Sequence, residues 1–177
     1  MQIRANPTSF YKYMAKEIER KYLAIKSKLP KLENGEVYSQ GYLCLSPLIR
    51  FRIVGNDTCL NIKNLKTGNV SRDEFEFHNN LNEDEINDLA KLAINKPIQK
   101  TRYKIEYESM VWEIDVYSGD NEGLITVDIE MPNESFELDF PDWVDKSREI
   151  TNDERFFNRN LGDHPYKEFR EEVGSSS

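Results

Sequence analysis

The chain has 177 residues, of which 32% are charged and 38% hydrophobic, and its formal net charge is −8. This length is typical of one domain with a sizeable core. The acidic balance argues against non-specific binding to DNA, RNA or an acidic membrane surface, although a local basic cluster or a cation could still hold a compact anion.

Two cysteines, Cys44 and Cys59, are too few for a disulfide framework and lack the spacing of a zinc site, which favours reduced thiols in a cytoplasmic protein. The sequence contains neither an apolar run of membrane-spanning length nor a signal-peptide core. We expect residues 1–13 to be a leader or extended start outside the folded part, residues 14–162 to form one domain, and residues 163–177 to form a C-terminal helix and tail.

Hydrophobic alternation and turn-forming residues predict eight strands. They lie near residues 16–24, 37–45, 48–54, 58–63, 71–78, 100–108, 111–117 and 124–131. Two helices are predicted as well. The first covers 83–95, with Asn82 as N-cap and Glu85 completing a capping box; the second starts with a similar box at Thr151–Glu154 and ends near Gly162.

Charged residues recur at alternate positions of the predicted strands, so that each strand has one charged face. The first strand carries Glu17, Glu19 and Lys21 on this face. Later strands carry Arg50 and Arg52; Arg72, Glu74 and Glu76; Lys100 and Arg102; Glu113 and Asp115; Asp128 and Glu130. Such faces usually form the solvated outside of a sandwich. The alternative is a closed antiparallel barrel with charges inside, whose apolar outside would be covered by the helices and a second subunit.

Glu17-Ile-Glu-Arg-Lys21 resembles the ExExK signature of the CYTH superfamily, the triphosphate tunnel metalloenzymes. The resemblance extends in order from about residue 15 to residue 161. It includes Gln40-Gly-Tyr-Leu43, Arg50-x-Arg52, Leu60–Lys63, Ser71–Glu76, Lys100–Tyr103, Trp112–Val116, Val127–Glu130 and Glu149–Asn158. It implies a mainly β (α+β) fold in which an eight-stranded, closed antiparallel barrel forms a tunnel with a charged interior and flanking helices. The chain is most similar to the small, single-domain bacterial inorganic triphosphatases.

The resemblance also implies a role for each charged position. The expected phosphate-binding residues are Lys21, Arg50, Arg52, Lys63, Arg72, Lys100 and Arg102. The expected oxygen ligands of Mg²⁺ or Mn²⁺ are Glu17, Glu19, Glu130, Asp128, Glu74 and Glu76, with Glu113 and Asp115 orienting arginines or serving a second metal. Asp128 stands where Glu is common. Lys21 and Tyr42 are the expected catalytic pair, although Tyr42 could equally be a packing residue.

The expected activity is metal-dependent hydrolysis of tripolyphosphate to pyrophosphate and phosphate. The alternatives are a nucleoside or thiamine triphosphatase, a class IV-type adenylyl cyclase, and a non-catalytic protein that binds polyphosphate or a phosphorylated metabolite. The expected partner is a small triphosphate rather than nucleic acid or a membrane, and a homodimer is an open option. His78 and His164 fall outside the motifs and are expected to be surface or core residues.

Overall fold

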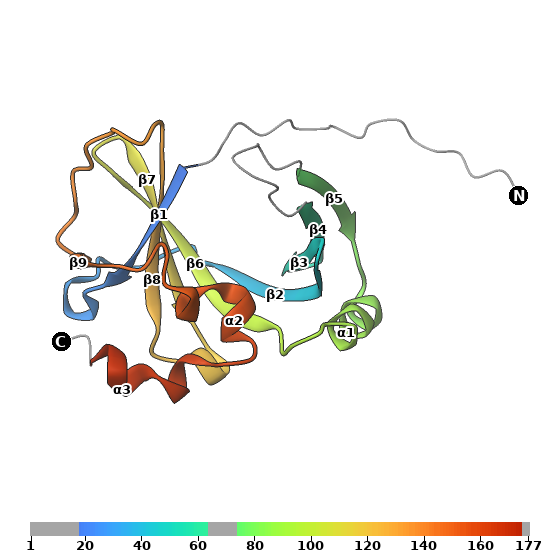
Figure 1. The fold of residues 1–177 in the computed structure, drawn as a ribbon. Helices are drawn as coiled ribbons and strands as arrows, with labels where there is room; N and C mark the ends of the chain where they lie inside the picture. The colour runs from blue at the N-terminus through green and yellow to red at the C-terminus, as the bar shows by residue number, and fades with distance from the viewer. Residues whose placement is uncertain (1–17, 64–73, 175–177) are drawn as a thin grey trace, which may run out of the picture.

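The computed structural model describes residues 18–63 and 74–174, which build one antiparallel sheet with short helices around it (Figure 1). The strands are β1 (Ile18–Ala24), β2 (Glu36–Leu45), β3 (Leu48–Val54), β4 (Asp57–Lys63), β5 (Glu74–Asn80), β6 (Ile98–Tyr107), β7 (Met110–Tyr117), β8 (Ile125–Met131) and β9 (Val144–Glu149). Their order in the sheet is β5-β4-β3-β2-β6-β7-β8-β1-β9. Hairpins connect most neighbours, whereas β1 reaches its place between β8 and β9 through long-range pairing.

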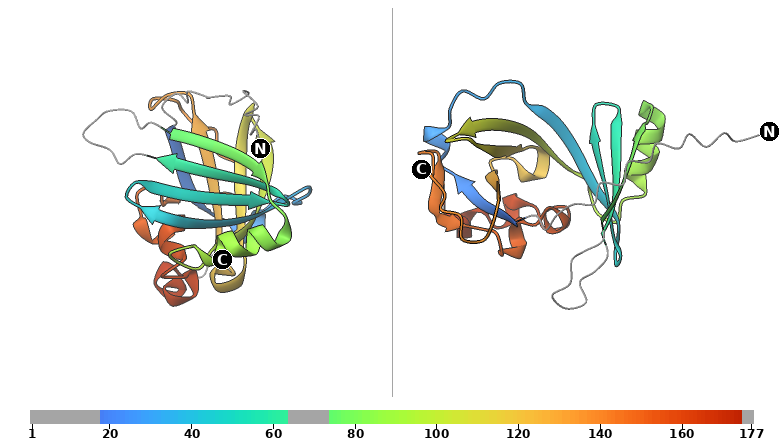
Figure 2. Two further views of the ribbon diagram at one scale, coloured as in Figure 1. Left: turned by 90° about the vertical axis from the view of Figure 1, so that its right-hand side faces the viewer. Right: turned by 90° about the horizontal axis from the view of Figure 1, so that it is seen from above.

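The predicted closed barrel of eight strands is wrong. The sheet has nine strands, and it remains open because β5 and β9 are its two ends and do not pair with each other. Figure 2 shows a strongly curved sheet in which β3, β4 and β5 form one wall, while β1, β7 and β8 form another. The eight predicted strands match β1 to β8 with small shifts at their ends; β9 was missed because Val144–Glu149 is mostly polar and exposed.

The helices are shorter than expected. Helix α1 covers Glu83–Lys91, and its predicted capping box of Asn82 and Glu85 is confirmed. The second predicted helix is instead a 3-10 turn, η3 (Glu154–Phe156), followed by α2 (Asn158–Leu161); its cap is Asp153, not Thr151. The remaining elements are η1 (Lys26–Lys28), η2 (Gly119–Asn121), η4 (Tyr166–Glu168) and α3 (Arg170–Val173). Within the described ranges, no helix is both long and apolar enough to span a bilayer.

The convex side of β1, β7 and β8 is covered mainly by irregular chain rather than by the two predicted helices. Trp112, which is fully buried, packs edge-on against Trp143 with ring centroids 5.8 Å apart, and Phe140 packs on both Trp112 and Tyr22. Leu29, Leu32 and Leu138 join the same core. The predicted helices 83–95 and 152–161 were expected to cover part of the outside of a closed barrel; on this part of the open sheet, Phe140 and Trp143 from the loop after β8 provide the aromatic cover.

The C-terminal segment closes one end of the concave side with a second apolar core. Leu23, Ile98, Tyr117 and Leu124 come from the strands or their ends. Against them pack Ile150, Phe156, Leu161, Tyr166 and Phe169. On β1, Leu23 follows Lys21 by two residues and so lies on the same face. The same spacing relates Ile98 to Lys100 on β6 and Tyr117 to Asp115 on β7. The charged part of the concave side therefore begins directly beside this apolar core.

Candidate active site on the polar face

One face of the curved sheet carries the charged residues from end to end, and we call it the polar face. Directly paired residues in antiparallel strands project to the same side, so the register defines its membership. On the β6-β7-β8-β1 wall it carries Lys100, Arg102, Lys104, Glu113, Asp115, Asp128, Glu130, Glu19 and Lys21. On the β2-β3-β4-β5 wall it carries Glu36, Tyr38, Gln40, Tyr42, Arg50, Arg52, Cys59, Asn61, Glu76 and His78. Lys100 and Tyr38 are paired where β6 meets β2, which joins the two walls.

Asp115 is the centre of the ionic contacts on this face. Its carboxylate is fully buried and receives two hydrogen bonds from Arg102, of 2.7 Å from Nε and 2.6 Å from Nη2, as well as the buried ammonium of Lys100. Burial alone would raise the pKa of Asp115, but Lys100 and Arg102 hold it well below the usual range. Removing one member of such a buried pair typically costs about 3–5 kcal/mol, so this contact fixes how the two cations are presented.

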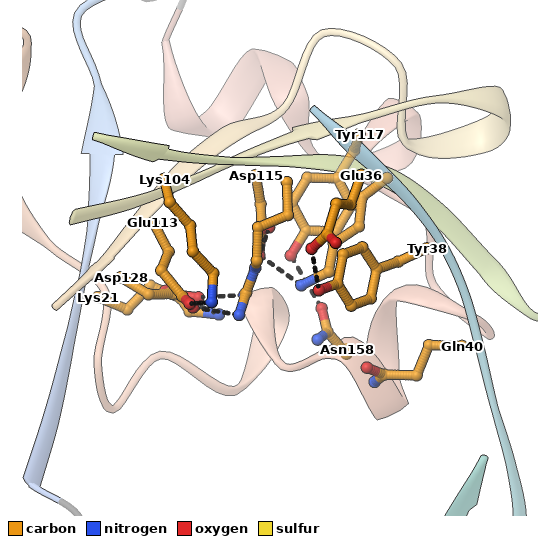
Figure 3. Close-up of polar contacts among 12 residues, drawn as sticks. Lys21, Glu36, Tyr38, Gln40, Lys104, Glu113, Asp115, Tyr117, Asp128 and Asn158 are labelled. Atoms are coloured by element: carbon orange, nitrogen blue, oxygen red, sulfur yellow. Dashed lines mark hydrogen bonds and ion pairs between the residues drawn. The ribbon is translucent and has the colours of Figure 1, made fainter. Parts of the chain in front are cut away.

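Arg102 connects Asp115 to the neighbouring carboxylates. Its Nη1 contacts Glu113, and its Nη2 lies 3.0 Å from Oδ2 of Asp128. Lys21 reaches the other oxygen of Asp128 at 3.2 Å, so this carboxylate lies between two cations (Figure 3). Burial would lower the pKa of Lys21, but the charge of Asp128 raises it above the usual value, which keeps Lys21 protonated.

Acidic groups gather beside Lys21 without a matching number of cations. Glu19 and Glu130 are directly opposite each other on β1 and β8, an arrangement of like charges that is unfavourable unless a cation is shared. The side chain of Glu19 is accessible to solvent, but the surrounding protein partly desolvates its carboxylate. This desolvation and the negative charge of Asp128 raise the pKa of Glu19. Oδ1 of Asp128 is buried and accepts no hydrogen bond from the described residues, although the ammonium of Lys21 lies 3.2 Å away.

The opposite wall has the complementary imbalance. Arg50 and Arg52 form no ion pair with any carboxylate in residues 18–62 and 75–174, whose side chains the structure describes, and Nε of Arg50 is buried there without a hydrogen-bond partner. The ring of Tyr38 lies between Arg52 and Arg102, with guanidinium carbons 5.7 and 5.8 Å from its centroid. Within these residues, Arg50 and Arg52 on β3 thus have charges available to an anion.

Tyr42 is buried on the polar face, and its hydroxyl accepts a hydrogen bond of 2.9 Å from Gln40 Nε2. Burial raises the pKa of Tyr42, so the hydroxyl stays protonated at neutral pH. Because Gln40 already donates to the oxygen, the hydroxyl hydrogen is free to be donated elsewhere. The positive charge of Lys21 acts on Tyr42, but the two side chains share no hydrogen bond.

The remaining predicted site residues are placed only in part. Glu17 and Arg72 lie outside the described residues. Lys63 and Glu74 are paired at the ends of β4 and β5, where the backbone alone is described. Glu76 is exposed on β5 and accepts a hydrogen bond of 3.0 Å from Asn61 Nδ2, far along the sheet from Glu19 and Glu130. The structure thus brings Glu19, Asp128, Glu130 and Lys21 together, and it leaves Glu76 on the other wall.

Sequence comparison relates this chain to proteins that act on a polyanion, which agrees with the charged groups of the polar face. The chain is 37% identical over 161 residues to an inorganic triphosphatase of Acetivibrio thermocellus, which covers 89% of this chain and all of the relative. The chain belongs to the CYTH-type inorganic triphosphatase family. An inorganic triphosphatase of Nitrosomonas europaea is 29% identical over 155 residues, covering 82% of this chain and 95% of the relative. No family model matches the chain.

A solved structure of an inorganic triphosphatase superposes with a TM-score of 0.62 and 26% identity, covering 84% of this chain and 95% of the other. The family resemblance seen in the sequence is thereby confirmed. Membership in this family also suggests a metal cofactor. The polar face fits one, since the carboxylates of Glu19 and Glu130 are directly opposed and Asp128 Oδ1, buried beside them, contacts the ammonium of Lys21 without a hydrogen bond.

The sequence did not predict that two residues, Thr151 and Asn158, form hydrogen bonds that support the site. Thr151 Oγ1 accepts a hydrogen bond of 3.0 Å from the backbone N–H of Lys21, where the pairing of β1 with β9 shifts register. Asn158 in α2 accepts a hydrogen bond of 2.8 Å from the hydroxyl of Tyr117, beside Lys100. Both lie in the matched Glu149–Asn158 stretch, but their contacts span 130 and 41 residues and leave no local signal.

Replacing Thr151 with Val should misplace Lys21, because the backbone N–H of Lys21 loses its acceptor. We expect a loss of about 1 kcal/mol in the free energy of unfolding, the usual net value of one hydrogen bond. Turnover of the substrate should fall as well. Urea unfolding and steady-state kinetics measure the two effects. Thr151→Ser, which keeps the hydroxyl, is the matched control and should behave as the parent protein; equal losses in both variants would contradict this role.

The Lys100 ammonium should give substrate binding a pH dependence. Burial lowers the pKa of Lys100 to about 8 against the opposing charge of Asp115, so Lys100 is protonated below this pH and loses its proton above it. We expect kcat/KM for a polyanionic substrate to fall as the pH rises through about 8, since this ratio reports the free enzyme. Lys100→Gln should lower kcat/KM about 10-fold or more at pH 7.

In that variant the fall near pH 8 should disappear, because the titrating ammonium is gone while Arg102 still neutralises Asp115. Comparing the two pH profiles in the same buffers removes any contribution from titration of the substrate. An identical fall in the parent protein and in Lys100→Gln would show that another group is responsible.

Proposed function

We propose that this chain hydrolyses inorganic triphosphate to pyrophosphate and phosphate with the help of Mg²⁺ or Mn²⁺. The observation that carries the proposal is that arginines stay out of ion pairs on one wall of the polar face, while carboxylates oppose each other on the other wall. Arg50 and Arg52 lack acidic partners within the described ranges, while Glu19 and Glu130 oppose each other on the other wall. A linear polyanion that carries a divalent cation complements both halves at once.

The cations of the face are suited to hold the phosphate groups. Arg50 and Arg52 offer guanidinium groups that can bind phosphate oxygens in a bidentate manner, and the contact of Arg52 with Tyr38 limits its mobility. Lys100, Arg102 and Lys21 lie on the β6-β7-β8-β1 wall, which we call the acidic wall because it carries the opposed Glu19 and Glu130. These three cations extend the positive field toward the two glutamates. Since Asp115 and Asp128 already orient these three, little reorganisation is needed when the substrate arrives.

The acidic wall would hold the divalent cation. Glu19, Glu130 and Asp128 offer only oxygen atoms, the ligand type that Mg²⁺ and Mn²⁺ prefer. Glu113 is engaged with Arg102 and Lys104, so we assign it and Asp115 to orienting cations. When bound, the divalent cation supplies positive charge to phosphate oxygens and to the attacking water. For Glu17, Glu74 and Glu76, the role of ligands to Mg²⁺ or Mn²⁺ stays a prediction from the sequence.

In the proposed reaction, the oxygen of a water molecule bonds to the terminal phosphorus and the P–O bond to the rest of the substrate breaks. Pyrophosphate leaves with the bonding electron pair, and the attacking water gives its proton to the leaving pyrophosphate or to solvent. Phosphoryl transfer depends mainly on positioning and charge stabilisation, which this face supplies through its lysines and arginines. Tyr42 is suited to donate a hydrogen bond to a phosphate oxygen because its hydroxyl is neutral and accepts from Gln40.

Replacing Lys21 or Glu130 with Ala should lower turnover on the order of 10²–10³, the usual scale for one electrostatic stabiliser. Phosphate release from tripolyphosphate measures the effect. Lys91→Ala on the exposed face of α1 is a control that removes a lysine far from the polar face and should retain activity. Activity near that of the parent protein in both site variants would rule out the assignment.

A panel of substrates and metals separates the proposed activity from its alternatives. Purified protein is incubated with tripolyphosphate, ATP or thiamine triphosphate, each with Mg²⁺ or Mn²⁺, and the products are separated by chromatography. We expect tripolyphosphate to be the best substrate by kcat/KM. Cyclic AMP from ATP would instead indicate a cyclase, and tight binding of tripolyphosphate without turnover under any metal would indicate a binding protein.

A further inference from the structure

A second group of potential metal ligands lies on the polar face, away from the acidic wall. Cys59 on β4 is paired with His78 on β5, and Glu76 is the next residue of β5 on the same face. One ligand atom from each of these three side chains lies within 4.8 Å of the others. Among the side chains that the structure describes, those of residues 18–62 and 75–174, this is the one group of three His, Cys, Asp or Glu that converges so closely.

We propose that Cys59, Glu76 and His78 form a binding site for a divalent transition metal of the Zn²⁺ class. Sulfur, imidazole nitrogen and carboxylate oxygen together are a donor set for borderline metals, whereas Mg²⁺ and Mn²⁺ favour oxygen alone. Bond lengths of roughly 2.0–2.3 Å place the ligand atoms of a tetrahedral site roughly 3.5 Å apart. Side-chain rotations alone can close the difference, since Glu76 and His78 are exposed.

Neighbouring side chains already support this geometry. Asn61 Nδ2 donates a hydrogen bond of 3.0 Å to Glu76, which orients its carboxylate on the sheet. Asp57 Oδ2 lies 3.6 Å from Nδ1 of His78, and metal-binding histidines commonly direct their second nitrogen toward such a carboxylate. The buried Cys59 forms the floor of the site, where a thiol is shielded from solvent.

The site would leave one coordination position open. Three protein ligands and one free position are typical of zinc sites that bind water or another small ligand. A groove of about 300 Å³ lies beside the group, and Tyr38, Arg52, Asp57, Cys59 and His78 are among its lining residues. Arg52 is also directly paired with Cys59 on the adjacent strand. An anion held by Arg52 could therefore occupy the open position.

The decisive experiment is a titration of the protein with Zn²⁺, measured by isothermal calorimetry. Excess Mg²⁺ is present so that sites made of oxygen ligands alone are already occupied. We expect one Zn²⁺ per chain for the parent protein and at least a 10-fold weaker affinity in both Cys59→Ser and His78→Ala. Cys44→Ser, which removes the other thiol, is the matched control and should bind as the parent protein does. Unchanged Zn²⁺ affinity in both site variants, or no binding by the parent protein, would overturn the proposal.

Cobalt substitution gives a readout that does not depend on enzymatic activity and that is taken first on the parent protein, without any variant. Co²⁺ added to the parent protein should produce a thiolate-to-cobalt charge-transfer band, and added Zn²⁺ should abolish this band. The band should persist in Cys44→Ser. A parent protein that binds Co²⁺ without this band does not use a thiolate, and that result would overturn the role of Cys59.

Discussion

The fully buried carboxylate of Asp115 pairs with both Lys100 and Arg102, and the rest of the polar face depends on this contact. The guanidinium group of Arg102 also contacts Glu113 through Nη1 and Asp128 through Nη2, so its position fixes both carboxylates. Asp128 in turn forms an ion pair with Lys21. The low-dielectric surroundings strengthen these contacts and make each unpaired member costly. The apolar core beside them, built by Tyr117, Leu23 and the C-terminal segment, excludes water from this end of the face.

The two walls of the sheet divide the chemistry between them. The wall of β1, β7 and β8 has its cations tied to carboxylates and retains opposed acids, while the wall of β3 keeps arginines without acidic partners in the described ranges. Each wall therefore presents charged groups that no contact on the same wall compensates within these ranges. The relation of the chain to inorganic triphosphatases agrees with a polyanionic ligand, and we propose that a divalent cation accompanies it. Such a ligand would replace repulsion on both walls by attraction, which is the physical basis of our proposal.

Alternation in the sequence predicted most of the strands and their charged face, because a buried apolar side and a polar side must alternate along each strand. It could not predict whether the sheet closes, since curvature and the pairing of the outermost strands depend on contacts between distant segments. β9 lacks an alternating pattern, and Thr151 bonds to Lys21 across the chain instead of capping a helix. Cys59 and His78 meet only through the register of β4 with β5, so their spacing gives no zinc signature.

A structure with a slowly hydrolysed imido analogue of triphosphate and Mn²⁺ tests the division of the face most directly. Anomalous scattering locates the manganese independently of the phosphates. The account predicts phosphate oxygens on the guanidinium groups of Arg50 and Arg52, with manganese beside Glu19, Asp128 and Glu130. An analogue bound away from the polar face, or manganese bound without any of these three carboxylates, would contradict it.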